Sequence, residues 1–110
     1  MKIILAVLLG VVTFNASANE QLNGFAKCSM VARILELEND ADLFESAYKK
    51  LKKLEELDQE FINMVYYTEG LMVGFASASG KDKNTVARNF FYVNCDGSNK
   101  QYAEDLTKEN

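Results

Sequence analysis

Residues 59–79 read QEFINMVYYTEGLMVGFASAS, and this stretch decides the fold. Most of its residues are apolar or aromatic, and they show no alternation of the kind that a half-buried strand requires. Asp58 is a good cap before it, Glu60 suits the dipole of a first helical turn, and Gly80 stops the helix. The stretch therefore predicts one helix. Because that helix is apolar on most faces, we expect it to be central and packed on several sides.

Helical patterns also cover the rest of the chain. No proline occurs, and the dominant residue types favour helices. The spacing of apolar residues predicts helices over 21–38, 41 to about 57, 84 or 85 to 95, and 98–108. Asp40 is expected to cap the second of these helices. The predicted fold class is all-α, a small four- to five-helix bundle forming a single domain.

The first 18 residues have the layout of a cleavable secretory signal peptide. Lys2 provides a positive start, residues 3–12 form an apolar run, and residues 16–18 form an A-x-A cleavage site. The run of about ten residues is too short for the roughly twenty that a spanning helix needs. A buried N-terminal helix is the alternative, and it leaves the cleavage site unexplained. We therefore expect a Sec-type signal peptide (1–18), a periplasmic domain (19–110) and no membrane span after cleavage.

The charge balance limits the classes of partner. Without Lys2, 11 Lys and Arg residues face 16 Asp and Glu residues, which is a net charge of about −5. This balance argues against a nucleic acid and against an anionic membrane surface, both of which select basic faces. It is compatible with a basic protein partner, although solubility alone is the simpler explanation. The expected partners are proteins of the cell envelope, and a homodimer is left open.

Two cysteines, Cys28 and Cys95, lie near the two ends of the predicted domain. In an exported domain of this size, an even cysteine count predicts a disulfide. It would close a loop of about 68 residues and contribute roughly 4 kcal/mol on the chain-entropy model. Two free thiols are the alternative. A zinc site of the usual nitrogen and sulfur ligands cannot be completed, because the chain has no histidine.

The sequence contains no recognisable catalytic constellation. The absence of histidine excludes Ser-His and Cys-His pairs and any imidazole base. We therefore predict no catalytic residue, no metal and no cofactor, and we expect that the protein is not an enzyme. A hydrolase that uses two carboxylates remains the last alternative.

One carboxylate, Glu69, lies inside the most apolar helix. One hypothesis makes it a pH-sensing group or a partner contact. The simpler interpretation places it on that helix's one exposed edge, beside Thr68.

Gly70 and Gly74 form a G-x-x-x-G pattern in the same helix. In lipid this pattern is typical of a dimerisation face, but burying Glu69 there would cost roughly 2.5–3.5 kcal/mol. We therefore predict close helix packing at both glycines, for example by the helix that bears Cys28. The alternative is a groove along Gly70 and Gly74 that a partner segment fills.

Aromatic residues are the remaining candidates for binding. At helical spacing they are most often core, but neighbours such as Tyr66 and Tyr67 cannot both point inward. One member of each adjacent pair is expected at the surface, where an aromatic ring can anchor a partner. The predicted partner contacts are Tyr66, Tyr67, Phe75 and Tyr92.

Three short segments resemble the HdeA-like periplasmic acid-stress chaperones. These are residues 73–76 (VGFA), 81–83 (KDK) and 93–96 (VNCD), followed by a Lys-rich amphipathic tail. The resemblance implies a small exported helical protein whose one disulfide joins a first-helix cysteine, here Cys28, to a late-helix cysteine, here Cys95. The chain differs from that pattern by an insertion over about 38–58 and by the absence of a proline after the acidic loop.

A second, weaker resemblance is to the immunity proteins that block type VI secretion amidases. It rests on Tyr67, Gly70 and Gly74 together with the two cysteines. The chain lacks the second cysteine pair of that pattern. This resemblance implies an inhibitor that plugs the cleft of a cell-envelope enzyme.

The expected function is that of an exported protein-binding module, HdeA-like, acting as an acid-stress chaperone. Below about pH 4 the carboxylates protonate, and the net charge moves from about −5 toward +11. Self-repulsion would then loosen the packing or a dimer and expose apolar surface, while the disulfide keeps the chain compact. The alternative function is a periplasmic inhibitor or immunity protein.

Overall fold

The computed structural model describes residues 19–108, and within that range every regular element is a helix. The helices, in chain order, are the N-terminal helix (19–34), α2 (Glu38–Lys52), α3 (Gln59–Ser79), α4 (Lys83–Asn94) and α5 (Ser98–Lys108). The predicted all-α fold class is confirmed. The predicted signal peptide lies outside the described residues.

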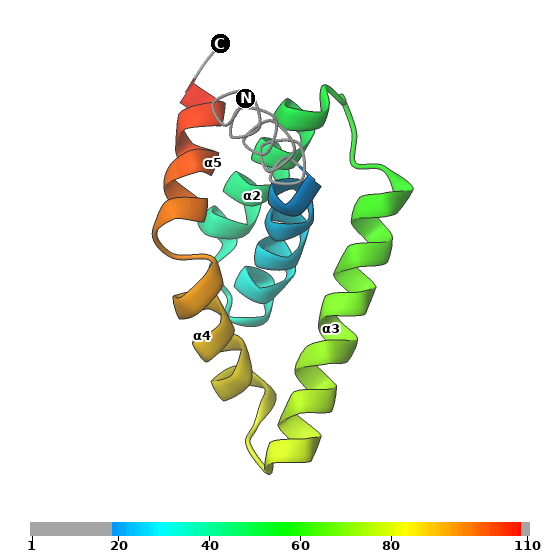
Figure 1. The fold of residues 1–110 in the computed structure, drawn as a ribbon, viewed down its shortest axis with the longest axis vertical. Helices are drawn as coiled ribbons and strands as arrows, with labels where there is room; N and C mark the ends of the chain where they lie inside the picture. The colour runs from blue at the N-terminus through cyan, green and yellow to red at the C-terminus, as the bar shows by residue number, and fades with distance from the viewer. Residues whose placement is uncertain (1–18, 109–110) are drawn as a thin grey trace, which may run out of the picture.

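The helices are arranged as two packed pairs around the N-terminal helix. α2 packs against α5, and α3 packs against α4. Figure 1 shows α4 and α5 on one side of the N-terminal helix and α3 on the other. α3 and α4 converge at the short loop that joins them (Figure 1). α3 forms one outer edge of the molecule.

The N-terminal helix, and not α3, is the central element. Its buried residues include Phe25 and Val31 together with small residues that allow neighbouring helices to approach closely, namely Ala26, Ser29 and Ala32. Over its 21 residues α3 buries only Phe61, Thr68 and Met72. The prediction that α3 is packed on several sides is therefore wrong. α3 has more apolar surface than its neighbouring helices cover.

The boundaries of α3 agree with the prediction. The Asp58 carboxylate accepts a hydrogen bond from the Phe61 backbone N–H, which caps the first turn. At the other end Gly80 adopts φ 71°, a left-handed conformation that glycine reaches without steric cost. These two residues fix a helix of 21 residues, about 30 Å long at 1.5 Å per residue.

The boundaries of α2 differ from the prediction at both ends. Asp40 lies inside the first turn, and the N-cap is Leu37, whose side chain makes no capping hydrogen bond. The helix ends at Lys52 because Lys53 turns left-handed and its N–H bonds to carbonyls of the last turn. Leu54 and Leu57, which were predicted as helical, instead lie in the connection to α3 and pack against the core.

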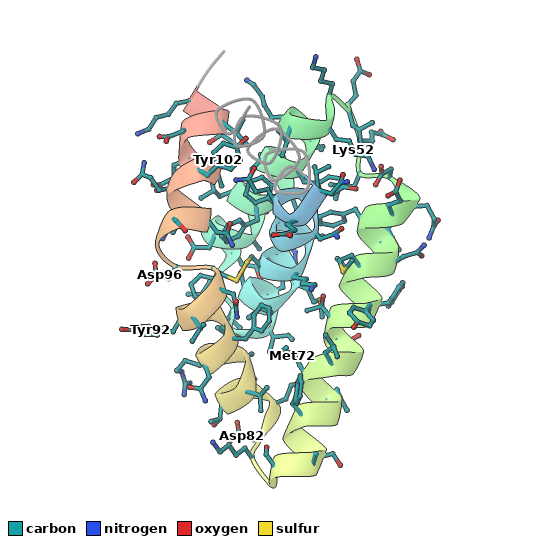
Figure 2. The ribbon with its side chains drawn as sticks, in the orientation of Figure 1. Lys52, Met72, Asp82, Tyr92, Asp96 and Tyr102 are labelled. Atoms are coloured by element: carbon teal, nitrogen blue, oxygen red, sulfur yellow. A yellow bond between two sulfur atoms is a disulfide. The ribbon has the colours of Figure 1, made fainter. Side chains whose placement is uncertain are left out.

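The predicted disulfide is confirmed. Cys28 of the N-terminal helix is bonded to Cys95 at the end of α4, and their Cα atoms lie 5.5 Å apart. Both residues are buried. The disulfide is drawn as a yellow bond in Figure 2. The bond fastens the α3–α4 pair to the central helix, because the chain reaches α4 only after passing through α2 and α3.

Candidate functional site

The outward side of α3 is an exposed apolar surface. Tyr66 is 69% exposed, Tyr67 and Phe75 are each 57% exposed, and Val73 is 51% exposed. Half or more of each of these large side chains therefore faces solvent. A monomeric soluble protein rarely exposes a contiguous apolar patch of more than a few hundred Å² unless it binds something.

This surface contains a groove of about 510 Å³, here called the α3 groove. The residues that line it are all uncharged and all belong to α3: Tyr66, Tyr67, Gly70, Leu71, Gly74, Phe75 and Ala78. They form two rows with a spacing of four residues, the spacing at which side chains on a helix lie one above another. One row has a tyrosine followed by three small residues, and the other row has three large residues. Gly70 and Gly74 have no side chains, and their backbone forms the floor of the groove.

The two glycines have no packing partner within the described chain. No atom outside the local helix lies within 4 Å of the position that a Cβ would take at Gly70 or at Gly74. The prediction of close helix packing at these residues is therefore wrong for the part of the chain that the structure describes. The alternative groove is present, and whether a partner fills it stays a prediction.

A second apolar groove, of about 430 Å³, runs along the other side of α3. It lies between Met30 of the N-terminal helix and residues on α3 and the connection before it, and its lining includes Leu57, Phe61, Ile62, Val65 and Tyr66. Glu69 also lines this groove and is the one carboxylate among its lining residues. Its side chain is only partly buried, so Glu69 lies at the margin of the helix rather than in the core. The pH-sensing role stays a prediction.

Tyr92 does not join the other predicted partner contacts. It is 76% exposed on α4, next to Val93 at 73%. Figure 2 shows Tyr92 on the side of α4 turned away from α3, whereas Met72 points from α3 into the space between α3 and α4. The structure therefore brings Tyr66, Tyr67 and Phe75 together and leaves Tyr92 on a different face.

A polar cluster fixes the joint between α2 and α3. The Asp58 carboxylate accepts hydrogen bonds from the Tyr48 hydroxyl and from the Lys52 ammonium, each at 2.7 Å. Lys52 also donates to Glu60 at 3.0 Å, and it lies beside the beginning of α3 (Figure 2). The hydrogen bond from Lys52 is the main reason that the pKa of Asp58 falls to about 2. Burial and the bond to Asp58 raise the pKa of Tyr48, so its hydroxyl stays protonated.

A second cluster joins the N-terminal helix to α2. The Arg33 guanidinium pairs with Glu38, Asp42 and Glu45. Its Nε lies 3.1 Å from the Glu45 carboxylate, and this hydrogen bond is the main cause that raises the pKa of Arg33. Ser29 also donates to Glu45, at 3.2 Å. Arg33 lies 12 positions from Glu45 in the sequence, so the i,i+4 spacing along α2 does not reveal this pair.

The described residues hold no group of three or more acidic or sulfur-containing side chains placed to bind a metal ion. Among residues 19–108, no helix is long and apolar enough to cross a membrane. Comparison of the whole chain with protein-family models, curated proteins and solved structures found no match. The α3 groove is therefore the feature on which a functional argument can be built.

Proposed function

We propose that this chain is an exported protein-binding module of the acid-stress chaperone type, and that the α3 groove is the surface on which it holds apolar segments of other proteins. The observation that carries this proposal is the exposure of Tyr66, Tyr67 and Phe75 around a floor formed by two glycines. Rigid aromatic side chains supply large contact area at a low entropic cost, which is why they anchor protein interfaces. The groove has no charged lining residue, so it suits apolar side chains of varied sequence.

Export to the periplasm is part of the same proposal, and two features support it. The chain begins with the pattern of a signal peptide, and a buried disulfide is typical of proteins that fold in an oxidising compartment. The chain has no histidine and 16 Asp and Glu residues, so a response to acid would have to come from its carboxylates.

The two polar clusters suggest how acid would act on the fold. The link from the N-terminal helix to α2 depends on ion pairs between Arg33 and three carboxylates, Glu38, Asp42 and Glu45. The pKa of Asp58, the cap of α3, is lowered to about 2, mainly by the hydrogen bond from Lys52, so this carboxylate is still largely ionised at pH 3. We therefore expect α3 to keep its cap at pH 3, while the disulfide limits any expansion of the chain.

The test is a client-aggregation assay at pH 2–3 with the oxidised protein of residues 19–110. We expect suppression of aggregation at equimolar amounts, and loss of suppression in the double variant Tyr66→Ser/Phe75→Ser. The control is Tyr92→Ser, which removes an exposed ring from another face and should retain full suppression. No suppression by the unmodified protein, or equal losses in both variants, would reject the proposal.

A second candidate is an inhibitor of a cell-envelope enzyme. The observation that favours it is that the α3 groove is already open in the folded chain, so binding needs no acid-induced change. This function predicts a stoichiometric complex with one folded partner at pH 7. The two functions are separated by capturing bound proteins from periplasm at pH 7 and at pH 3. The unmodified protein and the Gly70→Arg variant serve as baits. One partner held only at pH 7 supports the inhibitor, and many partners held only at pH 3 support the chaperone.

A further inference from the structure

We infer that the second groove, the one along α3 that Glu69 lines, is a binding site for a basic amphipathic helix of another polypeptide. The apolar lining would contact the apolar face of that helix, and the Glu69 carboxylate would pair with one of its lysine or arginine side chains. Tyr66 is the one lining residue that this site shares with the α3 groove. The inference therefore goes beyond the proposed function and does not rest on it.

The carboxylate of Glu69 has no partner within residues 19–108. It forms no ion pair there and accepts no hydrogen bond. Its side chain is partly buried beside Val65 and Tyr66, where water hydrates a carboxylate less fully than on an open surface. In the described chain no buried side-chain oxygen or nitrogen lacks a hydrogen-bond partner, so the unpaired oxygens of Glu69 are reachable from solvent. Such a carboxylate favours a cation that comes from outside the chain.

The groove supplies no cation of its own. Its lining residues include neither lysine nor arginine. Arg33, one turn after Met30 on the N-terminal helix, is engaged by three carboxylates at the link to α2. Lys52, which precedes the connection to α3, pairs with Asp58 and Glu60. Neither of these two side chains is left to neutralise Glu69.

Tyr66 adds an aromatic ring to the same cation site. It lies three positions before Glu69, a spacing at which side chains on a helix are neighbours, and both residues line the groove. Tyr66 is 69% exposed, so most of its ring is open to a ligand. A cation held between a carboxylate and an aromatic face gains both an ion pair and a cation–π contact. Lysine and arginine carry such a cation on an apolar stem.

The rest of the groove suits the apolar face of a helix. Its volume of about 430 Å³ lies within the range of known binding clefts. From Phe61 to Glu69 it follows α3 for about 12 Å at 1.5 Å per residue, or two helical turns. An amphipathic helix presents apolar side chains over the same length at positions i, i+4 and i+7. The flexible thioether of Met30 can adapt to side chains of different shape.

Charge complementarity selects a basic helix as the occupant. Glu55 and Glu56, both exposed, directly precede Leu57, which lines the groove at the end opposite Glu69. A helix with basic residues about two turns apart would therefore meet acidic side chains at both ends of the groove. The net charge of about −5 over residues 19–110 adds a longer-range attraction for cationic partners. A neutral or acidic helix would gain neither effect.

Fluorescence anisotropy at pH 7 with the oxidised protein of residues 19–110 tests the inference. The probe is a labelled synthetic peptide of about 14 residues with leucine on one helical face and lysine on the other. We expect a dissociation constant on the order of 10 μM, raised about tenfold by Glu69→Gln. The matched control, Glu104→Gln, removes the same charge from a partly buried, unpaired carboxylate on α5 and should change the affinity by less than about twofold. Far-UV circular dichroism verifies that both variants remain helical.

Two further comparisons separate this site from the α3 groove and from charge alone. Ile62→Ser alters a residue that lines only the second groove and should weaken binding about fivefold or more, whereas Phe75→Ser alters only the α3 groove and should not. Peptides with glutamine or glutamate in place of every lysine should bind at least about tenfold more weakly.

Four results would overturn the inference. The first is a Leu–Lys peptide that does not bind at concentrations up to about 500 μM. The second is an equal loss of affinity in Glu69→Gln and Glu104→Gln, which would indicate attraction by net charge alone. The third is a glutamine peptide that binds as tightly as the lysine peptide, which would make the groove a purely apolar site. The fourth is a protein that self-associates and ignores the peptide, which would assign the groove to a second copy.

The failure of this inference is distinguishable from the failure of the proposed function. A protein that binds the Leu–Lys peptide through Glu69 at pH 7 but suppresses no aggregation at pH 2–3 would keep the inference and reject the chaperone function. A protein that suppresses aggregation but does not bind the peptide would do the reverse.

Discussion

Gly70 and Gly74 lie one helical turn apart on α3, and the faces on which their side chains would stand are open to solvent. The rings of Tyr66, Tyr67 and Phe75 border the space above them. α3 carries two glycines in its interior, and neither packs against another helix of the monomer. The surface at these glycines therefore has room for another molecule. The proposed binding function follows from this relationship.

Alanine at either glycine should stabilise the monomer. Each of Gly70→Ala and Gly74→Ala is expected to raise the free energy of unfolding by up to about 1 kcal/mol, because alanine is the better helix former and its methyl group meets no atom. Urea denaturation at pH 7 measures this change. Destabilisation by either variant would mean that the glycine packs inside the monomer after all.

Removal of the disulfide should destabilise the fold severely. The double variant Cys28→Ala/Cys95→Ala is expected to lose about 2–5 kcal/mol, because the bond closes a loop between residues separated by 67 positions. Urea denaturation at pH 7 measures the loss, and the unmodified protein with its bond reduced serves as the control. Comparable stability of the oxidised and reduced forms would contradict the structural role assigned to the bond.

Asp58 should stabilise the protein in a pH-dependent way. Its pKa is about 2 in the folded chain and near 3.8 without partners, so its charged interactions with Lys52 and Tyr48 contribute fully above pH 4. That contribution is lost as the pH falls from about 4 to about 2, since the unfolded state then binds the proton more readily. Asp58→Asn keeps a capping side chain but removes the charge. Its deficit in unfolding free energy should be clear at pH 7 and vanish near pH 2, whereas a constant deficit would argue against the ion pair.

Arg33 should matter more to stability than the lysine nearest to Glu45 in sequence. Arg33→Met is expected to cost about 1–3 kcal/mol, because it removes charged hydrogen bonds to a partly buried carboxylate. The matched control, Lys49→Met, removes a positive charge one turn from Glu45 and should change the stability by less than about 0.5 kcal/mol. Equal losses in thermal denaturation would favour the pairing expected from i,i+4 spacing.

Local sequence signals predicted the elements of this fold better than their arrangement. Asp58 and Gly80 fixed the ends of α3 because capping and left-handed turns depend on a few adjacent residues. The disulfide followed from an even cysteine count. α2 ends earlier than predicted because Lys53 takes a left-handed conformation that its residue type does not announce. Leu54 continues the helical spacing of the apolar residues, although it lies in the loop after α2.

Long-range packing explains the errors at the candidate site. Apolar content along α3 was interpreted as burial on several sides, yet burial depends on how many neighbours reach the helix. The helix that occupies the centre instead carries small residues such as Ala26 and Ala32, whose importance lies in close approach rather than in hydrophobicity. For the same reason the G-x-x-x-G pattern of Gly70 and Gly74 does not reveal whether another helix of the domain packs beside them, and within the described residues none does.

The most direct test of the central claim is a nuclear magnetic resonance titration of the isotope-labelled oxidised protein with an acid-unfolded client at pH 3. The claim is that the α3 groove is the surface that holds other proteins. We predict that shifts and line broadening concentrate on Tyr66, Gly70, Gly74 and Phe75, with α5 and Tyr92 unaffected. Changes confined to other helices, or a client that binds without perturbing these four residues, would contradict it.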